Sequence, residues 1–252
     1  MLVAFRYLLR EELRFRKLLP WLVLSFFAFL FALNWNRFAP EATAVDKYVN
    51  VINLLIFRLL PLSAAIYSTM IIAQEVEQKT IVYLLTRPIP RWQLIIGRWA
   101  ATATTVVVIA GLGLFAAHLG SKGGMSFILR DLLALALGAA AYTSLFMFIT
   151  LLFNRALIIC VLFAFGWESS VPNLPTGLQG LSVLSHMQAI AKHPDGVQSG
   201  GQVLDLIAGL LGKTDMNPLT SGFGLLVFSV VMVGLSAYWF STHEFIPRED
   251  SE

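Results

Sequence analysis

The sequence predicts an all-α polytopic membrane protein with six transmembrane helices. Hydrophobic residues make up 57% of the 252 residues and charged residues only 13%, and the mean hydropathy is +0.74. Soluble domains of this size do not have such a composition. A helix that crosses a hydrocarbon core of about 30 Å needs about 20 apolar residues. Stretches near or above that length without Asp, Glu, Lys or Arg cover residues 18–36, 99–121, 132–154 and 216–243.

Two further apolar stretches bring the number of predicted spans to six. One of them is interrupted by Arg58, and the other carries Glu168 near its far end. The length rule then places one membrane domain over residues 18–243. Its spans are expected at about 18–36, 49–73, 94–119, 130–153, 156–174 and 219–241.

The distribution of Lys and Arg predicts the orientation, because these residues are retained on the cytoplasmic side of a membrane. With the amino terminus inside, eleven of the 18 Lys and Arg residues fall on the cytoplasmic side, six fall outside and Arg58 lies within a span. Both termini are therefore expected in the cytoplasm, with residues 244–252 as a short tail. Residues 175–218 form the predicted outer loop, in which Leu181 to Ala191 and Val203 to Leu211 are expected to be short helices on the outer surface.

Residues 1–17 predict an amphipathic interfacial (elbow) helix before the first span. Apolar residues recur there at three- and four-residue steps, beside a basic stripe of Arg6, Arg10, Arg14 and Lys17. Such a helix lies in the membrane interface, where its basic side chains contact anionic lipid headgroups. The alternative is a basic segment that only fixes the topology.

The most informative segment runs from Gln74 to Arg98, between the second and third predicted spans. Two carboxylates open it, and apolar residues then recur at helical spacing, which predicts a short amphipathic helix over residues 75–87. Pro88 and Pro90 end that helix before the chain re-enters an apolar stretch near Trp92. The sequence therefore predicts a helix on the cytoplasmic face, joined by prolines to the next span.

This segment resembles the type-2 ATP-binding-cassette (ABC) exporter permease family, whose members share a Glu-x-Glu-x-Gly-Thr, Leu-Leu, Pro-Ile-x-Arg, Gly-Lys pattern at this spacing. Two positions depart from the pattern, since Lys79 replaces the usual Gly and Arg98 the usual Lys. The predicted spans, elbow helix and charged tail also fit, so the resemblance covers essentially the whole chain. The matching residues are Glu75, Glu77, Thr80, Leu84, Leu85, Pro88, Ile89, Arg91, Gly97 and Arg98.

The resemblance implies that helix 75–87 is the coupling helix, which docks on a separate cytoplasmic ATPase. It assigns ATPase coupling to Glu75, Glu77, Thr80, Leu84, Leu85, Pro88 and Arg91. The expected protein is the transmembrane permease subunit of an ABC exporter or extractor in the cytoplasmic (inner) membrane of a prokaryote. Its apolar span surfaces favour an amphiphilic or lipid-like substrate.

The same resemblance implies a set of partners. Two ABC ATPase subunits and a second permease copy or a paralogue are expected, besides membrane lipid and an accessory periplasmic or extracellular protein. This chain is then not itself an enzyme and holds no cofactor, because ATP and Mg²⁺ bind to the partner ATPase. The stretch 208–214 resembles the end of a phosphate-binding loop, but Ile207 stands where its first Gly belongs.

Arg58 is the sharpest feature within the predicted spans, because a charged side chain in mid-bilayer normally faces a partner or a water-filled cavity. By helical rise, Arg58 lies about 26 Å from Glu75, and Glu168 lies about 20 Å from Arg155. Since these depths are similar, we predict an Arg58–Glu168 pair that borders the translocation path. In the alternative, Arg58 extends outward to the interface and Glu168 is solvated.

Other functions have weaker support in the sequence. The basic residues reflect membrane orientation, so nucleic acid is excluded as a partner. His118, His186 and His193 lack the converging ligands of a metal site, and solvated or capping roles are expected for them. An intramembrane serine protease or other membrane enzyme is an alternative, because Ser236 lies in a Gly-x-Ser motif, although His243 is about 10 Å along the same helix. A non-transporting membrane anchor for an ATPase in a cell-envelope machine remains the other alternative.

Overall fold

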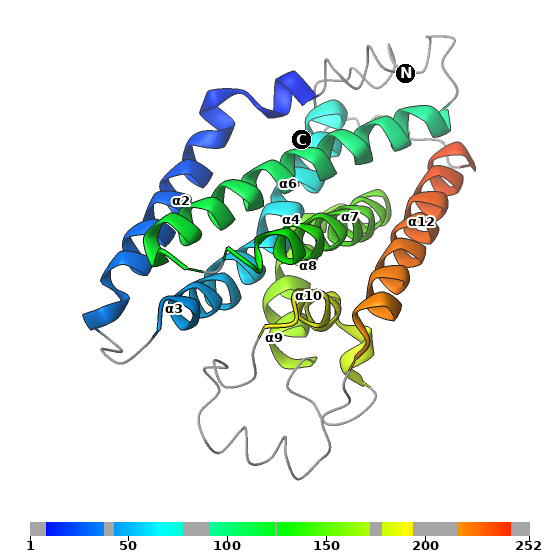
Figure 1. Cartoon of the computed structure of the whole chain (residues 1–252). Helices are drawn as coiled ribbons and strands as arrows, with labels where there is room; N and C mark the ends of the chain where they lie inside the picture. Colours follow the sequence, from blue (N-terminus) through cyan, green and yellow to red (C-terminus); the bar gives the residue numbers. More distant parts are fainter. Residues whose placement is uncertain are drawn as a thin grey trace.

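The described residues of the protein fold into a bundle of helices without strands (Figure 1). A computed structural model describes residues 9–37, 43–77, 91–123, 125–171, 178–193 and 216–242. Within them, five helices are long and apolar enough to cross a membrane: Phe15–Asn34, Ala44–Met70, Trp92–Ser121, Ile128–Leu152 and Pro218–Thr242. The helical membrane class is therefore confirmed, and the fifth predicted span, 156–174, is not among these five helices.

Helix α2 (Phe15–Asn34) contains the first predicted span and ends in a 3-10 turn, η1 (Trp35–Arg37). Residues 9–12 before it are helical, and the helix is interrupted at residues 13–14. The predicted elbow helix is thus described only over this short part. Residues 1–8 lie outside the described residues.

The second span is one continuous helical rod made of α3 (Ala44–Val51), a π-helical segment η2 (Ile52–Ile56) and α4 (Phe57–Glu77). It begins five residues before the predicted start, at a capping box in which Thr43 and Asp46 bind each other's backbone N–H. Such a box satisfies two N–H groups that a helix terminus leaves unpaired. The helix therefore starts in the polar sequence outside the apolar stretch.

Helix α7 (Ile128–Leu152) is the centre of the bundle, and α6 (Arg91–Ser121) and α4 pack against it (Figure 1). Small residues on α7, including Gly138, Ala139 and Ala141, let the neighbouring backbones approach closely. At Gly138, an added Cβ would lie 2.3 Å from Met187 Sδ. The core of the bundle is therefore tightly packed around the middle of α7.

The fifth predicted span, 156–174, is described only as far as Val171, and it contains a π-helical segment that the sequence did not predict. It consists of α8 (Ala156–Leu162), a π-helical segment η3 (Phe163–Trp167) and α9 (Glu168–Ser170). The apolar helix Ala156–Ser170 has 15 residues, or about 22 Å at 1.5 Å per residue, which is less than the thickness of a bilayer core. The six-span count therefore stays a prediction.

The outer loop contains the first of the two short helices that the sequence predicts. After a 3-10 turn, η5 (Leu178–Leu181), helix α10 (Val183–Ala191) packs against α7 and α12 (Pro218–Thr242). The predicted helix is therefore present, and Val183, Leu184 and Met187 on its apolar face are buried. That face fits against small residues of α7, which a single sequence does not show. The second predicted helix, Val203 to Leu211, lies outside the described residues.

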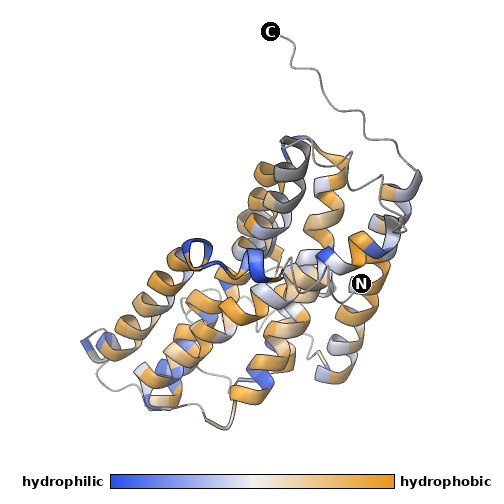
Figure 2. Cartoon of the chain, turned by 90° about the horizontal axis from the view of Figure 1, so that it is seen from above, coloured by the Kyte–Doolittle hydropathy of each residue, from blue (hydrophilic) through white to orange (hydrophobic). Residues whose placement is uncertain are grey.

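Helices α2 and α12 lie on opposite sides of the bundle (Figure 1). Each buries few of its residues within the chain, and large apolar side chains such as Phe26, Phe27, Phe223 and Val230 are exposed. Hydrophobic residues cover the bodies of the helices, and hydrophilic residues gather near their ends (Figure 2). This surface is suited to lipid rather than to water.

Candidate functional site

The predicted coupling residues lie at a gap between α4 and α6. Thr80, Leu84, Leu85 and Pro88 fall outside the described residues, and Arg91 is the first residue of α6. Their role in docking stays a prediction.

Glu75 and Glu77 belong to a different helix from the one that the sequence predicted. The backbone of α4 is helical as far as Glu77, so these residues end α4 and do not open a separate helix. The sequence between Ala73 and Glu77 contains no Gly or Pro that would end α4 sooner.

Arg58 and Glu168 do not form the predicted ion pair. Among the residues that the structure describes, no nitrogen of Arg58 lies within 4 Å of the Glu168 carboxylate. Instead, Arg58 Nη1 donates to Ser169 Oγ over 3.4 Å, and the Arg58 side chain is exposed. Glu168 is 2% exposed, so the alternative of a solvated carboxylate is also wrong. A position of both residues on the translocation path stays a prediction.

The Glu168 carboxylate binds the amino-terminal end of α10. It accepts hydrogen bonds from Ser182 Oγ (2.6 Å) and from the backbone N–H groups of Val183 and Leu184 (both 3.2 Å). Ser182 Oγ in turn accepts from the Ser185 N–H. A helix leaves its first N–H groups unpaired and carries partial positive charge at this end. The negative charge is therefore stabilised without a cation, which explains why Arg58 is not its partner.

Tyr142 of α7 lies beside this carboxylate in the same buried region. Its side chain is fully buried, and its hydroxyl group makes no hydrogen bond among the described residues. Tyr142 lies near the Glu168 carboxylate and the Leu184 backbone, but no hydrogen bond joins it to them.

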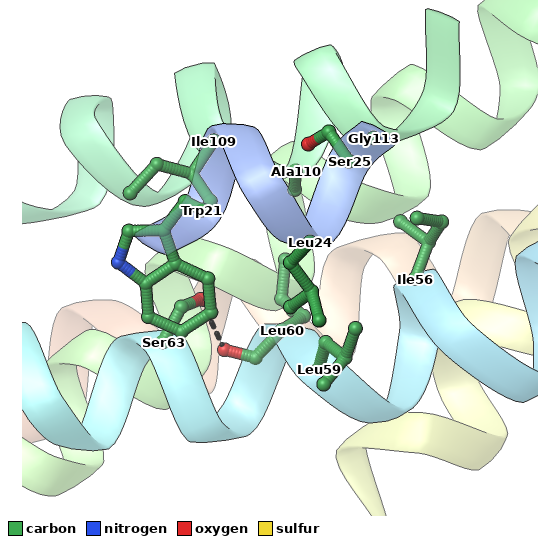
Figure 3. Close-up of a pocket in the computed structure, with 10 residues that line it drawn as sticks. All are labelled: Trp21, Leu24, Ser25, Ile56, Leu59, Leu60, Ser63, Ile109, Ala110 and Gly113. Atoms are coloured by element: carbon green, nitrogen blue, oxygen red, sulfur yellow. Dashed lines mark hydrogen bonds between the residues drawn. The ribbon is translucent and has the colours of Figure 1, made fainter. Parts of the chain in front are cut away.

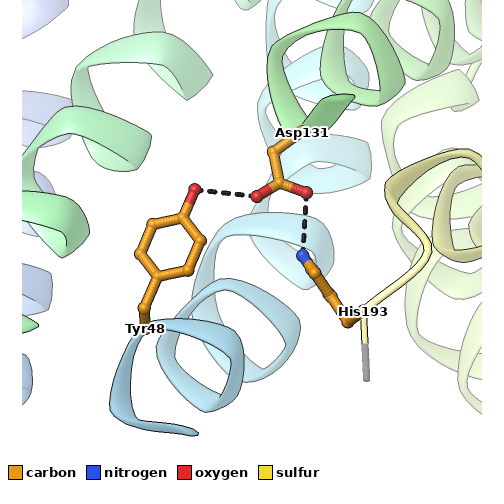
Figure 4. Close-up of polar contacts among 3 residues, drawn as sticks. All are labelled: Tyr48, Asp131 and His193. Atoms are coloured by element: carbon orange, nitrogen blue, oxygen red, sulfur yellow. Dashed lines mark hydrogen bonds and ion pairs between the residues drawn. The ribbon is translucent and has the colours of Figure 1, made fainter. Parts of the chain in front are cut away.

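A second buried carboxylate, Asp131, joins three elements (Figure 4). Its Oδ2 accepts from Tyr48 Oη of α3 over 2.7 Å, and its Oδ1 lies 2.8 Å from His193 Nε2. Asp131 is in the first turn of α7, where a negative charge is favoured by the helix dipole. The His193 ring contacts Phe57 and Phe127. His193 follows α10, so α10 is held at both ends by a buried carboxylate.

Sequence reasoning missed this group. The sequence analysis assigns no role to Asp131 and expects a solvated or capping role for His193, but the His193 side chain is only 8% exposed. His186 and His118 do have capping contacts, with the Gly180 and Gly123 carbonyl groups. Within the described part of the chain, no group of three or more His, Cys, Asp or Glu residues is arranged to hold a metal ion.

A third buried carboxylate, Glu12, lies just before α2 and binds α6. Its Oε2 accepts from Thr105 Oγ1 over 2.7 Å, and its Oε1 accepts from Thr102 Oγ1 over 3.2 Å. Burial raises the pKa of Glu12, although the two threonine hydroxyl groups act in the opposite direction. This contact joins the segment before α2 to the amino-terminal half of α6.

A small cavity lies between α2, α4 and α6 (Figure 3). It has a volume of about 30 Å³ and apolar walls such as Trp21, Leu60 and Ile109. The hydroxyl group of Ser63 donates to the Leu60 carbonyl group in its own helix. A cavity of this size holds at most a few water molecules, and apolar walls favour a dry interior. It is too small to bind an amphiphile.

Ser236 has a structural contact in place of a catalytic one. The residue is fully buried in α12, and its hydroxyl group donates to the Met232 carbonyl group one turn earlier. His243 lies outside the described residues. The contact is typical of a hydroxyl group that packs within a transmembrane helix, and it gives no support to the protease alternative.

A bundle of apolar helices with a few hydrogen-bonded carboxylates buried between them is typical of an integral membrane protein. Residues 25–245 match the protein family described as ABC-2 family transporter protein, and the chain belongs to that family. It is therefore a membrane permease subunit of an ABC transporter, and it works with an ABC ATPase. Members of this family form the membrane component of a transporter, which is generally non-catalytic. No curated protein matches the chain.

Proposed function

We propose that the chain exports or extracts an amphiphilic or lipid-like substrate from a prokaryotic cytoplasmic membrane, with both termini in the cytoplasm. Two ATPase subunits that bind ATP and Mg²⁺ dock on residues 75–91, and a second copy of the chain or a paralogue completes the permease. The family match over residues 25–245 is the observation that carries this proposal.

The arrangement of α4 and α6 supports the coupling step. Helix α4 runs into the predicted docking segment at Glu77, and α6 leaves it at Arg91. Both helices pack against the central helix α7. A displacement applied between two long helices is passed to the bundle as rigid-body motion, which a flexible loop would absorb.

The docking assignment is tested by Leu84→Asp and Leu85→Asp, each purified with the ATPase from membranes. We expect loss of the complex and of stimulated ATP hydrolysis while membrane insertion persists, because a carboxylate would be buried in an apolar contact. The matched control is Met125→Asp, since Met125 is 76% exposed and lies on the predicted outer side. Unchanged association and turnover in both docking variants would show that the segment is not the docking site.

Transport itself is tested with the intact complex in sealed vesicles that contain a fluorescent amphiphile. ATP-dependent movement of the amphiphile supports an exporter or extractor. ATP hydrolysis that is stimulated by the permease without any such movement would instead support the membrane-anchor alternative.

A further inference from the structure

Two π-helical segments lie directly before the contact between Arg58 and Ser169. In η2 the Phe57 N–H bonds to the Ile52 carbonyl group, and in η3 the Glu168 N–H bonds to the Phe163 carbonyl group, each five residues back. Such turns are rare, and they occur frequently at functional sites. Pro61 lies one turn beyond η2 and removes a backbone N–H there. The α8–α9 segment contains no proline, so helix disruption by proline does not account for both.

Arg58 presents an accessible positive charge in the middle of its span. It lies 14 residues after Ala44 and 12 before Met70, the ends of the apolar helix, or about 21 Å and 18 Å along it. A guanidinium group has five N–H donors, and the bond to Ser169 uses one of them. Glu168, the nearest acid along the neighbouring element, is already bound by α10.

The surface on both sides of this charge is apolar. Leu54 lies four residues before Arg58, and Phe165 lies four residues before Ser169, which is about one helical turn in each case. Leu54 is 38% exposed and Phe165 is 56% exposed. Trp167 is also exposed, and its Nε1 donates to the Leu181 carbonyl group. A cation between exposed apolar side chains is complementary to a molecule with an anionic head and an apolar tail.

We propose that Arg58 and Ser169 bind the anionic head group of the transported molecule, which is an amphiphile with a carboxylate or phosphate. The planar guanidinium group binds either anion through two N–H donors, and the Ser169 hydroxyl group, which accepts from Arg58, helps to hold it in position. Leu54 and Phe165 contact the apolar chain. This assignment rests on the proposed function, which it extends by naming the chemical class of the substrate.

The test uses the complex with its ATPase in discs of zwitterionic phosphatidylcholine at alkaline pH. The probe is spin-labelled stearic acid, and its methyl ester has the same chain without the charge. Electron paramagnetic resonance measures the immobilised fraction of each. We expect the wild-type protein to bind the acid about tenfold more tightly than the ester, as for a hydrogen bond to a charged group.

Three variants and a control separate the roles of charge and position. Arg58→Gln should remove the preference for the acid, Arg58→Lys should retain part of it, and Ser169→Ala should reduce it less than Arg58→Gln does. Arg130→Gln is the matched control, because Arg130 is an exposed arginine at the start of α7. It should bind both probes as the wild type does.

Two outcomes would overturn the site. Equal binding of acid and ester to the wild type would mean that the protein has no head-group site. A preference that persists in Arg58→Gln would assign it to the surrounding lipid contacts or to another cation. Failure of the proposed function can be distinguished from failure of the head-group site. If the proposed function is wrong, the ATPase will be absent from the purified protein, whether or not the acid or the ester binds.

Discussion

At the scale of residues, three buried carboxylates are each bound by donors that lie far away in the sequence. Glu12 binds two threonines, Asp131 binds a tyrosine and a histidine, and Glu168 binds the start of α10. A buried carboxylate without such partners costs several kcal/mol. Each one therefore connects two or more elements and keeps them in one relative position.

Glu12 gives the protein a pH-dependent stability. A carboxyl group whose pKa is raised in the folded state contributes stability below its ordinary value of 4.5, and this contribution is lost as the pH rises through the raised pKa. Glu12→Gln removes the charge and keeps a side chain of similar size. We therefore expect Glu12→Gln to be more stable than the wild type at neutral pH, measured as the midpoint of thermal unfolding in detergent over a pH series.

The half-buried neighbour Glu11 is the control for this measurement. Glu11→Gln should leave the pH profile of unfolding almost unchanged, because Glu11 is less buried than Glu12. If Glu12→Gln were less stable than the wild type at every pH, then Glu12 would be ionised and stabilising in the folded protein.

Sequence reasoning found only part of this chemistry. It identified Glu168 as an acid within a span, but it chose Arg58 as the partner because both lie at a similar depth. The actual donors, Ser182 and two backbone N–H groups, are supplied by α10, whose packing position no local pattern reveals. Asp131 directly precedes an apolar stretch, and Glu12 lies in the charged segment before the first one; charged residues at such positions are usually solvated.

At the scale of elements, close helix contacts depend on individual glycines. At Gly120 of α6, an added Cβ would lie 2.7 Å from the Phe29 carbonyl oxygen and 2.7 Å from Ala32 Cβ, both of α2. These atoms belong to the backbone and to a short side chain, so they do not move away as the end of a long side chain does. The two helices are in direct backbone contact at this point.

Gly120→Ala should therefore push α2 away from α6. Overpacking of this kind costs about 1–3 kcal/mol, and we expect a lower midpoint of unfolding in detergent. Gly234→Ala in α12 is the matched control, since nothing lies within 4 Å of a Cβ there and alanine favours a helix over glycine. Equal stability of the Gly120→Ala variant and the wild type would mean that the helices separate without cost.

The elements also show where pattern reasoning succeeds. The positions of α2, α4, α6, α7 and α12 could be predicted from the length of the apolar stretches. This works because the thickness of a membrane fixes the length of a spanning helix. The broken segment from Ala156 to Ser170 was predicted as a full span because Ala, Leu, Ile and Phe continue along it. Its π-helical segment is not visible in that composition, and the segment contacts α4 and, through Glu168, the start of α10.

At the scale of the whole molecule, the orientation in the membrane rests on the distribution of basic residues. The loop that contains Met125 is predicted outside, and the turn at Asn154 is predicted inside. Both residues are exposed, and the single native cysteine, Cys160, is buried. The chain therefore allows a simple labelling test of its topology.

We expect Met125→Cys and Asn154→Cys, each in a Cys160→Ala background, to react from opposite sides of the membrane. A membrane-impermeant maleimide added to intact cells should label Met125→Cys only, and Asn154→Cys should become reactive after the cells are opened. The Cys160→Ala protein without a new cysteine is the control. The reverse pattern would place residues 75–91 outside the cell, away from any cytoplasmic ATPase.

The length of α6 has a consequence for the mechanics of the protein. Its 31 residues extend about 46 Å, while the hydrocarbon layer is about 30 Å thick, so α6 leans steeply or projects past the bilayer. Gly120 contacts α2 near the carboxyl-terminal end of α6, and Glu12, just before α2, binds Thr102 and Thr105 near the middle of α6. A change in the tilt of α6 within the bilayer therefore moves α2 with it. The exposed phenylalanines of α2 then move through the surrounding lipid.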